Sequence, residues 1–106
     1  MTILNATTND FDTLIQESSG PVLVDFWASW CGPCMSMAPT LADLAADFSG
    51  QALVVKVNVE EEPELSKKYG VSGLPTLCIF KNGVEVKRVI GTQSRMRLAM
   101  LIEEQL

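Results

Sequence analysis

The clearest pattern along the chain is a pair of mostly apolar runs, of which the first is almost continuous. They cover residues 22–28 (Val-Leu-Val-Asp-Phe-Trp-Ala) and residues 52–59. Strands that are covered on both faces lack the alternation of half-exposed strands, because neither face meets water. Both runs are therefore predicted to be buried strands of a sheet with helices on both sides.

Before the first run, apolar residues recur at helical spacing. The segment Thr7–Asp10 offers several N-caps, and Phe11, Leu14 and Ile15 follow on one face of a first helix. We expect that helix to stop near Ser19–Pro21, where glycine and proline interrupt the pattern.

A longer helix is predicted between the two runs, ending at about Phe48 before Ser49–Gly50. Pro39 lies inside it and should kink it, because the proline ring removes one backbone hydrogen bond and clashes with the preceding turn. The positions expected to form its buried stripe are Met37, Ala38, Leu41, Leu44, Ala45 and Phe48.

The second half of the chain begins with an acidic helix start. Glu60–Glu64 places carboxylates at the positive end of a helix that runs to Tyr69–Gly70. Residues 76–80 are a predicted strand, and Asn82–Gly83 suits the positive φ angles of a tight hairpin. Residues 84–90 are then the returning antiparallel strand.

Ser94 is a suitable N-cap for a last helix, whose inward residues are Leu98, Leu101 and Ile102. The resulting order is β-α-β-α-β-α-β-β-α. Alternating strands and helices predict parallel crossovers, and the hairpin adds antiparallel strands. The predicted fold class is α/β, with a central mixed sheet flanked by helices on both faces, in a single domain over residues 1–106.

Charge and composition exclude several classes of function. The net charge of −5 and the scattered lysines and arginines argue against a nucleic-acid surface, which needs a basic patch. No apolar stretch approaches the ~18 residues of a membrane span. The first ten residues contain neither a basic region nor a long apolar run, so we expect no secretory signal and a cytoplasmic location.

The chain has three cysteines and no histidine, which narrows the chemistry. An odd number of cysteines cannot form a closed disulfide framework. A closed zinc site takes four ligands, whereas this chain offers three thiols and no imidazole. We therefore expect no metal site.

Cys31 and Cys34 stand three residues apart at the start of the long predicted helix, in the sequence Trp30-Cys-Gly-Pro-Cys34. This spacing puts both sulfurs on one helix face, close enough for a disulfide to form and open. A structural role for that disulfide is disfavoured, because so small a loop barely constrains the unfolded chain. The buried stripe, traced back from Phe48, reaches Cys34, so Cys34 is predicted to face the interior and Cys31 to lie at an exposed tip.

Cys31 is also predicted to be the helix N-cap. There its sulfur can accept a hydrogen bond from the backbone N–H of Cys34, since Pro33 has no N–H. The partial positive charge of a helix N-terminus favours thiolate over thiol. The predicted reaction is attack by Cys31 on a substrate disulfide, followed by attack of Cys34 on Cys31, which releases the reduced substrate and leaves an internal disulfide.

These residues resemble the thioredoxin family, and the resemblance covers essentially the whole chain. Trp-Cys-Gly-Pro-Cys is highly specific to thioredoxins proper, whereas protein disulfide isomerases usually carry another pair of residues between the cysteines. The resemblance implies the thioredoxin fold and a general protein disulfide reductase. The matching positions are residues 24–34 (Val-Asp-Phe-Trp-Ala-Ser-Trp-Cys-Gly-Pro-Cys), Pro39, Lys56, Gly73–Thr76, Phe80–Gly83 and Gly91.

The resemblance also implies roles for residues outside the motif. Pro75 matches the family's cis-proline beside the cysteines; without the resemblance a trans-proline would be expected, because cis bonds are about 5–6% of X–Pro bonds. Trp27 matches a residue that supports the site from behind, and plain core packing is the alternative. The family's flat apolar contact surface is matched by Trp30, Gly32, Pro33, Val59, Leu74, Pro75, Ile90 and Gly91.

Asp25 and Lys56 each interrupt a buried strand, where a charge is costly unless it is paired or neutralised. In thioredoxins the matching carboxylate lies behind the buried cysteine and helps to move its proton, and the matching lysine tunes that carboxylate. The alternative is a structural ion pair near the edge of the sheet.

Three further residues stand apart from the family pattern. Cys78 matches no catalytic position and is predicted to be a buried, inert thiol. Met35 stands where many bacterial members carry lysine, and Glu60 stands where aspartate is frequent. These differences are expected to leave the reaction unchanged.

From the resemblance we expect a monomer with no bound cofactor, in which electrons reside in the Cys31–Cys34 dithiol. The implied electron donor is thioredoxin reductase, an NADPH-dependent flavoprotein, and the implied acceptors are disulfide-containing client proteins. Two alternatives stay open at this point. One is a dedicated reductant of a single client enzyme, and the other is a scaffold or subunit in which the thiols are incidental.

Overall fold

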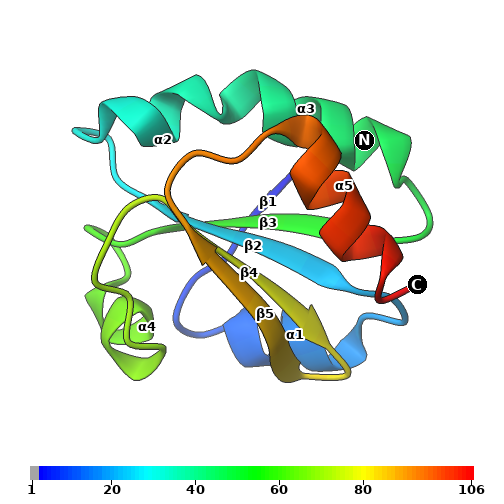
Figure 1. Cartoon of the computed structure of the whole chain (residues 1–106). Helices are drawn as coiled ribbons and strands as arrows, with labels where there is room; N and C mark the ends of the chain where they lie inside the picture. Colours follow the sequence, from blue (N-terminus) through cyan, green and yellow to red (C-terminus); the bar gives the residue numbers. More distant parts are fainter. Residues whose placement is uncertain (1–2) are drawn as a thin grey trace.

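A computed structural model of the chain describes residues 3–106, and its centre is a five-stranded mixed sheet (Figure 1). The strands are β1 (Leu4–Asn5), β2 (Val22–Trp27), β3 (Leu53–Asn58), β4 (Thr76–Lys81) and β5 (Val84–Ile90). They lie in the order β1-β3-β2-β4-β5, so β2 is the central strand. β3 is parallel to β1 and β2, whereas β4 is antiparallel to β2 and β5. The predicted mixed sheet is confirmed.

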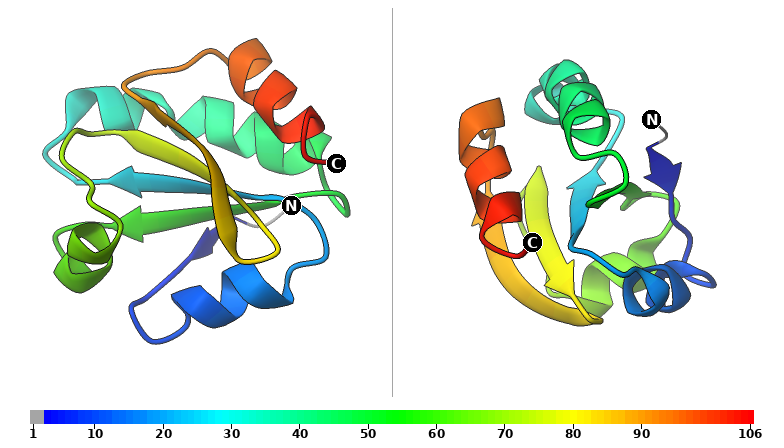
Figure 2. Two further views of the ribbon diagram at one scale, coloured as in Figure 1. Left: turned by 60° about the horizontal axis from the view of Figure 1, so that its bottom comes forward. Right: turned by 90° about the vertical axis from the view of Figure 1, so that its right-hand side faces the viewer.

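Helices cover both faces of this sheet. They are α1 (Phe11–Glu17), α2 (Gly32–Ser36), α3 (Ala38–Asp47), α4 (Pro63–Lys68) and α5 (Arg95–Glu103). Figures 1 and 2 show α2, α3 and α5 on one face and α1 and α4 on the other. The predicted α/β class, with helices on both faces, is therefore confirmed.

Each face of the sheet has its own hydrophobic core. Beneath α3 and α5, the core includes Leu23, Leu41, Leu44, Val54, Leu77, Leu98, Leu101 and Ile102. Beside α1 and α4, the core includes Phe11, Ile15, Val24, Phe26, Val55, Leu65, Cys78 and Phe80. Burial of a Val, Leu, Ile or Phe side chain contributes about 1.5–3 kcal/mol, so these two cores hold the sheet and its helices in place.

Alternation along β2 divides its side chains between the two cores. Val22, Val24 and Phe26 belong to the core beside α1 and α4, whereas Leu23 belongs to the core beneath α3 and α5. Successive side chains of a strand point to opposite faces. Asp25 therefore points to the same face as Leu23, which is the face covered by the helix that carries the cysteines.

The long helix predicted up to Phe48 is instead two helices, α2 and α3, separated at Met37. Pro39 explains the break, because it has no N–H to donate to the carbonyl of Met35 and its ring displaces that turn. Ala38 was predicted to be buried but is exposed. It follows the buried Met37, and successive residues of a helix are turned by about 100° from one another.

The tight turn and the helix N-cap predicted in the second half of the chain are confirmed. Asn82 and Gly83 have φ angles of 53° and 80°, as the predicted tight turn requires. Ser94 Oγ accepts a hydrogen bond from the Arg97 N–H at 3.1 Å, so Ser94 caps α5. Within residues 3–106, no helix combines the length and hydropathy of a membrane span.

Candidate active site

The cysteine pair lies where β2 leads into α2. Cys31 and Cys34 form a disulfide, and their Cα atoms are 5.2 Å apart, which is within the usual range for bridged cysteines. Cys31 is the N-cap of α2, and its Sγ accepts a hydrogen bond from the Cys34 N–H at 3.2 Å. The predicted redox pair and the predicted N-cap are both present.

The two cysteines differ in exposure less than predicted. Cys34 is 2% exposed, as expected for an inward residue, but Cys31 is only 5% exposed. The prediction of an exposed tip for Cys31 is wrong, because the disulfide holds its sulfur against the buried Cys34 and it packs with Ala28, Val59 and Leu74. Cys31 nevertheless lines a surface cavity and Cys34 does not, so Cys31 is the cysteine that borders solvent.

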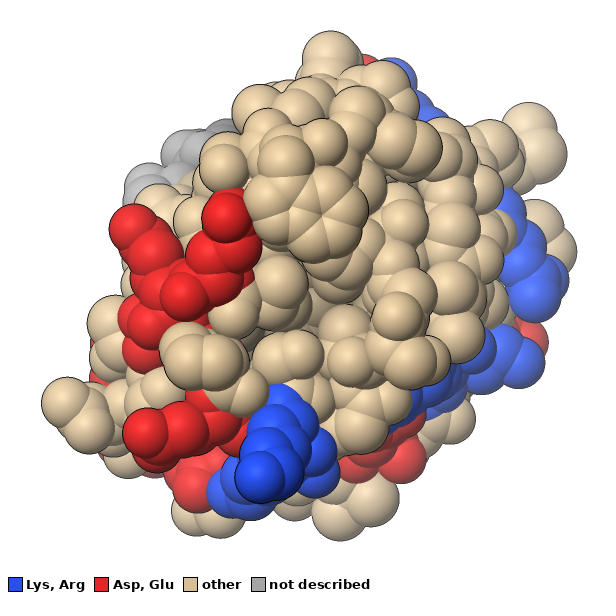
Figure 3. Space-filling view, turned by 90° about the vertical axis from the view of Figure 1, so that its left-hand side faces the viewer, with Lys and Arg blue, Asp and Glu red and all other residues tan. Residues whose placement is uncertain are grey.

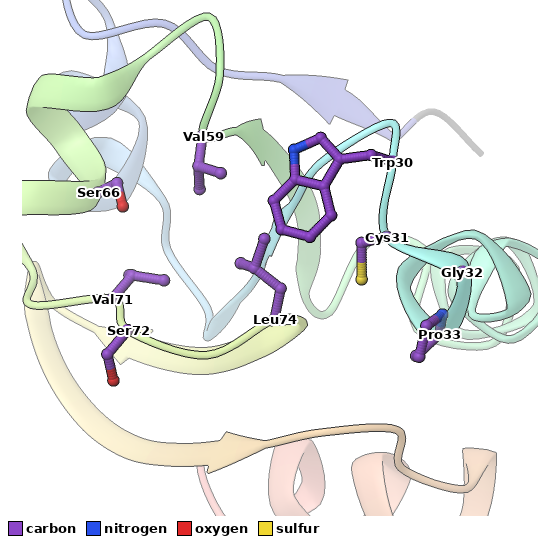
Figure 4. Close-up of a pocket in the computed structure, with 9 residues that line it drawn as sticks. All are labelled: Trp30, Cys31, Gly32, Pro33, Val59, Ser66, Val71, Ser72 and Leu74. Carbon is purple, nitrogen blue, oxygen red and sulfur yellow. The ribbon is translucent and has the colours of Figure 1, made fainter.

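The cavity beside Cys31 has a volume of about 470 Å³ (Figure 4). Trp30 stands at its rim with 70% of its surface exposed, so a large apolar side chain faces solvent beside Cys31. Figure 4 shows the Trp30 ring and Leu74 close to the Cys31 sulfur. The predicted contact residues that line the cavity are Trp30, Gly32, Pro33, Val59 and Leu74.

Ser66, Val71 and Ser72 form the far end of this cavity and were not singled out in the sequence. Ser66 is in α4, and the other two lie in the loop that leads to Pro75. For Val71 and Ser72 the one sequence signal was their place in the loop before Pro75. Ser66 had no such signal, since nothing in its residue type indicates a site.

The other three predicted contact residues lie beside the cavity lining. The Leu74–Pro75 peptide bond is cis, as the resemblance implied. The Gly91 N–H donates a hydrogen bond to Pro75 O at 2.8 Å, which ties the end of β5 to the proline. Ile90 is 57% exposed, and its Cγ2 lies 3.1 Å from the position of a Cβ built on Gly73. Ile90 and Gly91 therefore adjoin the loop that carries Leu74 and Pro75.

Asp25 is fully buried, and neither of its carboxylate oxygens has a hydrogen-bond partner within residues 3–106. Burial raises the pKa of Asp25 from 3.8 to about 6, and the charge of Lys56 opposes part of that rise. Loss of solvation disfavours the charged form of an acid. A carboxyl group with this pKa can take up and release a proton near neutral pH.

Lys56 is half-buried and stands opposite Asp25 in the register of β2 and β3. Its Nζ lies 4.5 Å from the centroid of the Trp27 ring, a cation–π distance. The ion pairs between described residues do not include Asp25, and β2 is central. The alternative of a structural ion pair at the sheet edge is therefore wrong. Trp27 packs against the cysteines, as a supporting residue would.

Cys78 lies on the opposite face of the sheet from Asp25. It pairs in register with Val24 and Arg88, and it is completely buried in the core beside α1 and α4. Burial raises the pKa of the Cys78 thiol to about 12. The predicted burial of this thiol is confirmed, and its position separates it from the cysteine pair.

Charge is unevenly distributed around the end of the molecule at which α2 begins. Figure 3 shows uncharged surface across the middle of this face, with acidic side chains along one side and basic side chains along another. Glu60 and Glu61, which follow the cavity residue Val59, are both exposed. The apolar cavity therefore has an acidic neighbour on its Val59 side.

Fold and site together define a dithiol–disulfide oxidoreductase, with a disulfide at a helix N-cap beside a cis-proline and an apolar cavity. The family model for thioredoxin matches residues 2–104. Thioredoxins from Staphylococcus aureus strains COL and USA300 are 45% identical over 106 residues, the full length of this chain and of each relative. The chain belongs to the thioredoxin family, and it is a thiol–disulfide reductase with a redox-active Cys31–Cys34 pair.

Proposed function

We propose that Cys31 attacks client disulfides and that Cys34 resolves the mixed disulfide, in a general reductant of proteins. The observation that carries this assignment is the hydrogen bond from the Cys34 N–H to Cys31 Sγ at the start of α2. In the reduced protein the same donor and the helix N-terminus stabilise a thiolate at Cys31. Cys31 also borders the cavity through which a client disulfide can approach.

The reaction has two balanced exchanges. The Cys31 thiolate attacks one sulfur of the client disulfide, which forms a mixed disulfide and expels the first client thiolate. The Cys34 thiolate then attacks Cys31 Sγ, which forms the internal disulfide and expels the second client thiolate. Two electrons pass from the dithiol to the client.

Asp25 is proposed to accept the proton that Cys34 loses before the second exchange, with Lys56 tuning the carboxyl group. The support is that Asp25 points to the face covered by α2 and α3 and that its pKa is raised to about 6. A base with a pKa near the working pH is suited to reversible proton transfer. Lys56 lowers the Asp25 pKa from the level that burial alone would give.

The apolar surface around Cys31 is proposed to hold the client segment that carries the disulfide. It consists of Trp30, Gly32, Pro33, Val59, Leu74, Pro75, Ile90 and Gly91, five of which line the cavity. An apolar surface of this kind accepts many sequences, because its contacts are not directional. This breadth favours a general reductant over a dedicated one.

Further proposals concern partners and location. Thioredoxin reductase, an NADPH-dependent flavoprotein, is the proposed donor that returns the Cys31–Cys34 disulfide to the dithiol. Both cysteines and the cavity come from one chain, so the mechanism needs no second copy, and we propose a monomer. The proposed location is the cytoplasm.

Reduction of insulin by dithiothreitol, with and without the protein, tests the general function. We expect catalysis by the wild type and none by Cys31→Ser. A panel of unrelated disulfide proteins then separates a general reductant from a dedicated one. Absence of catalysis on every protein tested would favour the scaffold alternative.

A further inference from the structure

The turn that presents Trp30 beside the active site is held by a side chain from another loop. Ala28 O accepts a hydrogen bond from the Cys31 N–H at 3.2 Å, which makes Ser29 and Trp30 the two central residues of a turn. Because Trp30 is 70% exposed, its own packing contributes little to fixing this turn.

Glu60 supplies the contact that fixes it. Its Oε1 accepts hydrogen bonds from the Ser29 N–H at 3.1 Å and from Ser29 Oγ at 2.9 Å. Hydrogen bonds to an ionised acceptor are stronger than those between neutral groups. The Glu60 N–H in turn donates to Asn58 Oδ1 at 2.9 Å, so the glutamate is itself anchored at the end of β3.

These contacts join two sides of the cavity. Ser29 precedes Trp30 and Cys31, which form one side, and Glu60 follows Val59, which forms another. No hydrogen bond within residues 3–106 links Glu60 to either cysteine of the disulfide. The hydrogen bonds of Glu60 therefore reach residues next to the cavity lining and not the sulfurs.

We propose that Glu60 is a positioning residue that orders the Ser29–Trp30 turn for polypeptide clients. The inference rests on the proposed function, because it concerns the same cavity. When the turn is already ordered before binding, less conformational entropy is lost as a client binds. A protein client that lies across Trp30 benefits from this order, whereas a small aromatic disulfide that reaches only Cys31 does not.

Four variants distinguish the effect of the hydrogen bonds between Glu60 and Ser29 from the effect of the Glu60 charge. Glu60→Ala removes both, and Glu60→Gln removes the charge but keeps an oxygen acceptor for Ser29. Ser29→Ala removes the hydroxyl donor and keeps the N–H. Glu61→Ala is the matched control, because the neighbouring Glu61 carboxylate accepts no hydrogen bond within the described part of the chain.

The experiment compares two substrates. One is insulin at varied concentration with dithiothreitol as reductant, and the other is 5,5′-dithiobis(2-nitrobenzoate) with pre-reduced protein in a stopped-flow instrument. For Glu60→Ala, which loses both hydrogen bonds to Ser29, we expect the KM for insulin to rise about fivefold, with kcat nearly unchanged. Ser29→Ala should show a smaller rise, and so should Glu60→Gln, because its neutral oxygen is a weaker acceptor for Ser29. Glu61→Ala should match the wild type. The rate with the small disulfide should be the same in all five proteins.

Several results would overturn the proposal. A KM in Glu61→Ala as high as in Glu60→Ala, or no rescue in Glu60→Gln, would assign the effect to charge. A parallel loss with the small disulfide would place Glu60 in the sulfur chemistry or the fold, and Ser29→Ala repeats the test if Glu60→Ala fails to fold. An unchanged KM in Glu60→Ala overturns the inference alone, whereas an inactive wild type refutes the proposed function.

Discussion

Asp25 and Lys56 stand directly opposite one another in the central part of the sheet, yet their charges do not form an ion pair. The Lys56 ammonium instead lies 4.5 Å from the centroid of the Trp27 ring. Asp25 is left fully buried without a hydrogen-bond partner among residues 3–106. This arrangement keeps the Asp25 pKa at about 6. The same carboxyl group therefore lowers the stability of the folded protein near neutral pH and is suited to proton transfer.

The first prediction is that Asp25→Ala gains stability relative to the wild type as pH rises. Because the pKa is raised from 3.8 to about 6, the folded state binds the proton more tightly than the unfolded state. Wild-type stability is therefore full below about pH 4 and falls until about pH 6, by about 3 kcal/mol at 1.4 kcal/mol per pKa unit. Above about pH 6 the full loss of about 3 kcal/mol in stability remains.

Urea unfolding of the two oxidised proteins, from about pH 3.5 to about pH 8, measures this difference. The pH dependence of the difference is informative because any cavity left by the alanine adds a constant. Glu61→Ala, which removes an exposed carboxylate, should show no such trend. A difference between Asp25→Ala and wild type that is flat with pH would show that the Asp25 pKa is not raised.

The second prediction is that Asp25→Ala slows the resolving step more than the attacking step. Removal of a general base typically costs a factor of about 10²–10⁴ in the step that it assists. Rapid mixing of the reduced variant with a disulfide client, followed by acid quenching, should therefore reveal accumulated mixed disulfide that the wild type does not show. Equal rates of resolution in the two proteins would remove Asp25 from the mechanism.

The third prediction concerns the roles of Cys31 and Cys34 as the attacking and the resolving thiol. Cys34→Ser should capture client proteins as stable mixed disulfides, because the attacking thiol remains and the resolving thiol is gone. Cys31→Ser should capture none and should lack reductase activity. Non-reducing gels of lysates treated with each variant test this, and adducts on Cys31→Ser alone would reverse the roles.

The fourth prediction is that Cys78 stays unmodified in the folded protein. Its thiol is completely buried and its pKa is raised to about 12, so almost no thiolate forms at neutral pH. Alkylation of the native reduced protein, followed by peptide mass spectrometry, should label Cys31 first and Cys78 only after denaturation. Labelling of Cys78 at the rate of Cys31 would contradict this.

The fifth prediction concerns Gly20, just before β2. A Cβ at this position would collide with the backbone carbonyl oxygen of Gln51, and backbone cannot move aside as a flexible side chain can. We expect Gly20→Ala to lower the free energy of unfolding by about 1–3 kcal/mol. Gly32→Ala is the matched control, since a Cβ there has no neighbour within 4 Å. Equal stability of the two variants would show that the chain can relax around Gly20.

Much of the fold could be predicted from the sequence because its signals are local. The two apolar runs form β2 and β3, Asn82–Gly83 form the hairpin turn, and Ser94 is the N-cap of α5. The Cys31 N-cap was also readable, since Pro33 has no N–H and Cys34 offers the next one. Each depends on backbone geometry over a few residues, and that geometry is set by the residues themselves.

What the sequence determined, then, is the identity of the reacting thiols, their helix N-terminus and the order of the elements. Only the tertiary structure decided that Cys31 is buried beside a cavity, that Asp25 has no ion-pair partner, and that Glu60 binds Ser29. These features join residues far apart along the chain, and they depend on how side chains pack and lose water when the elements meet. Residue types and spacing do not carry that information.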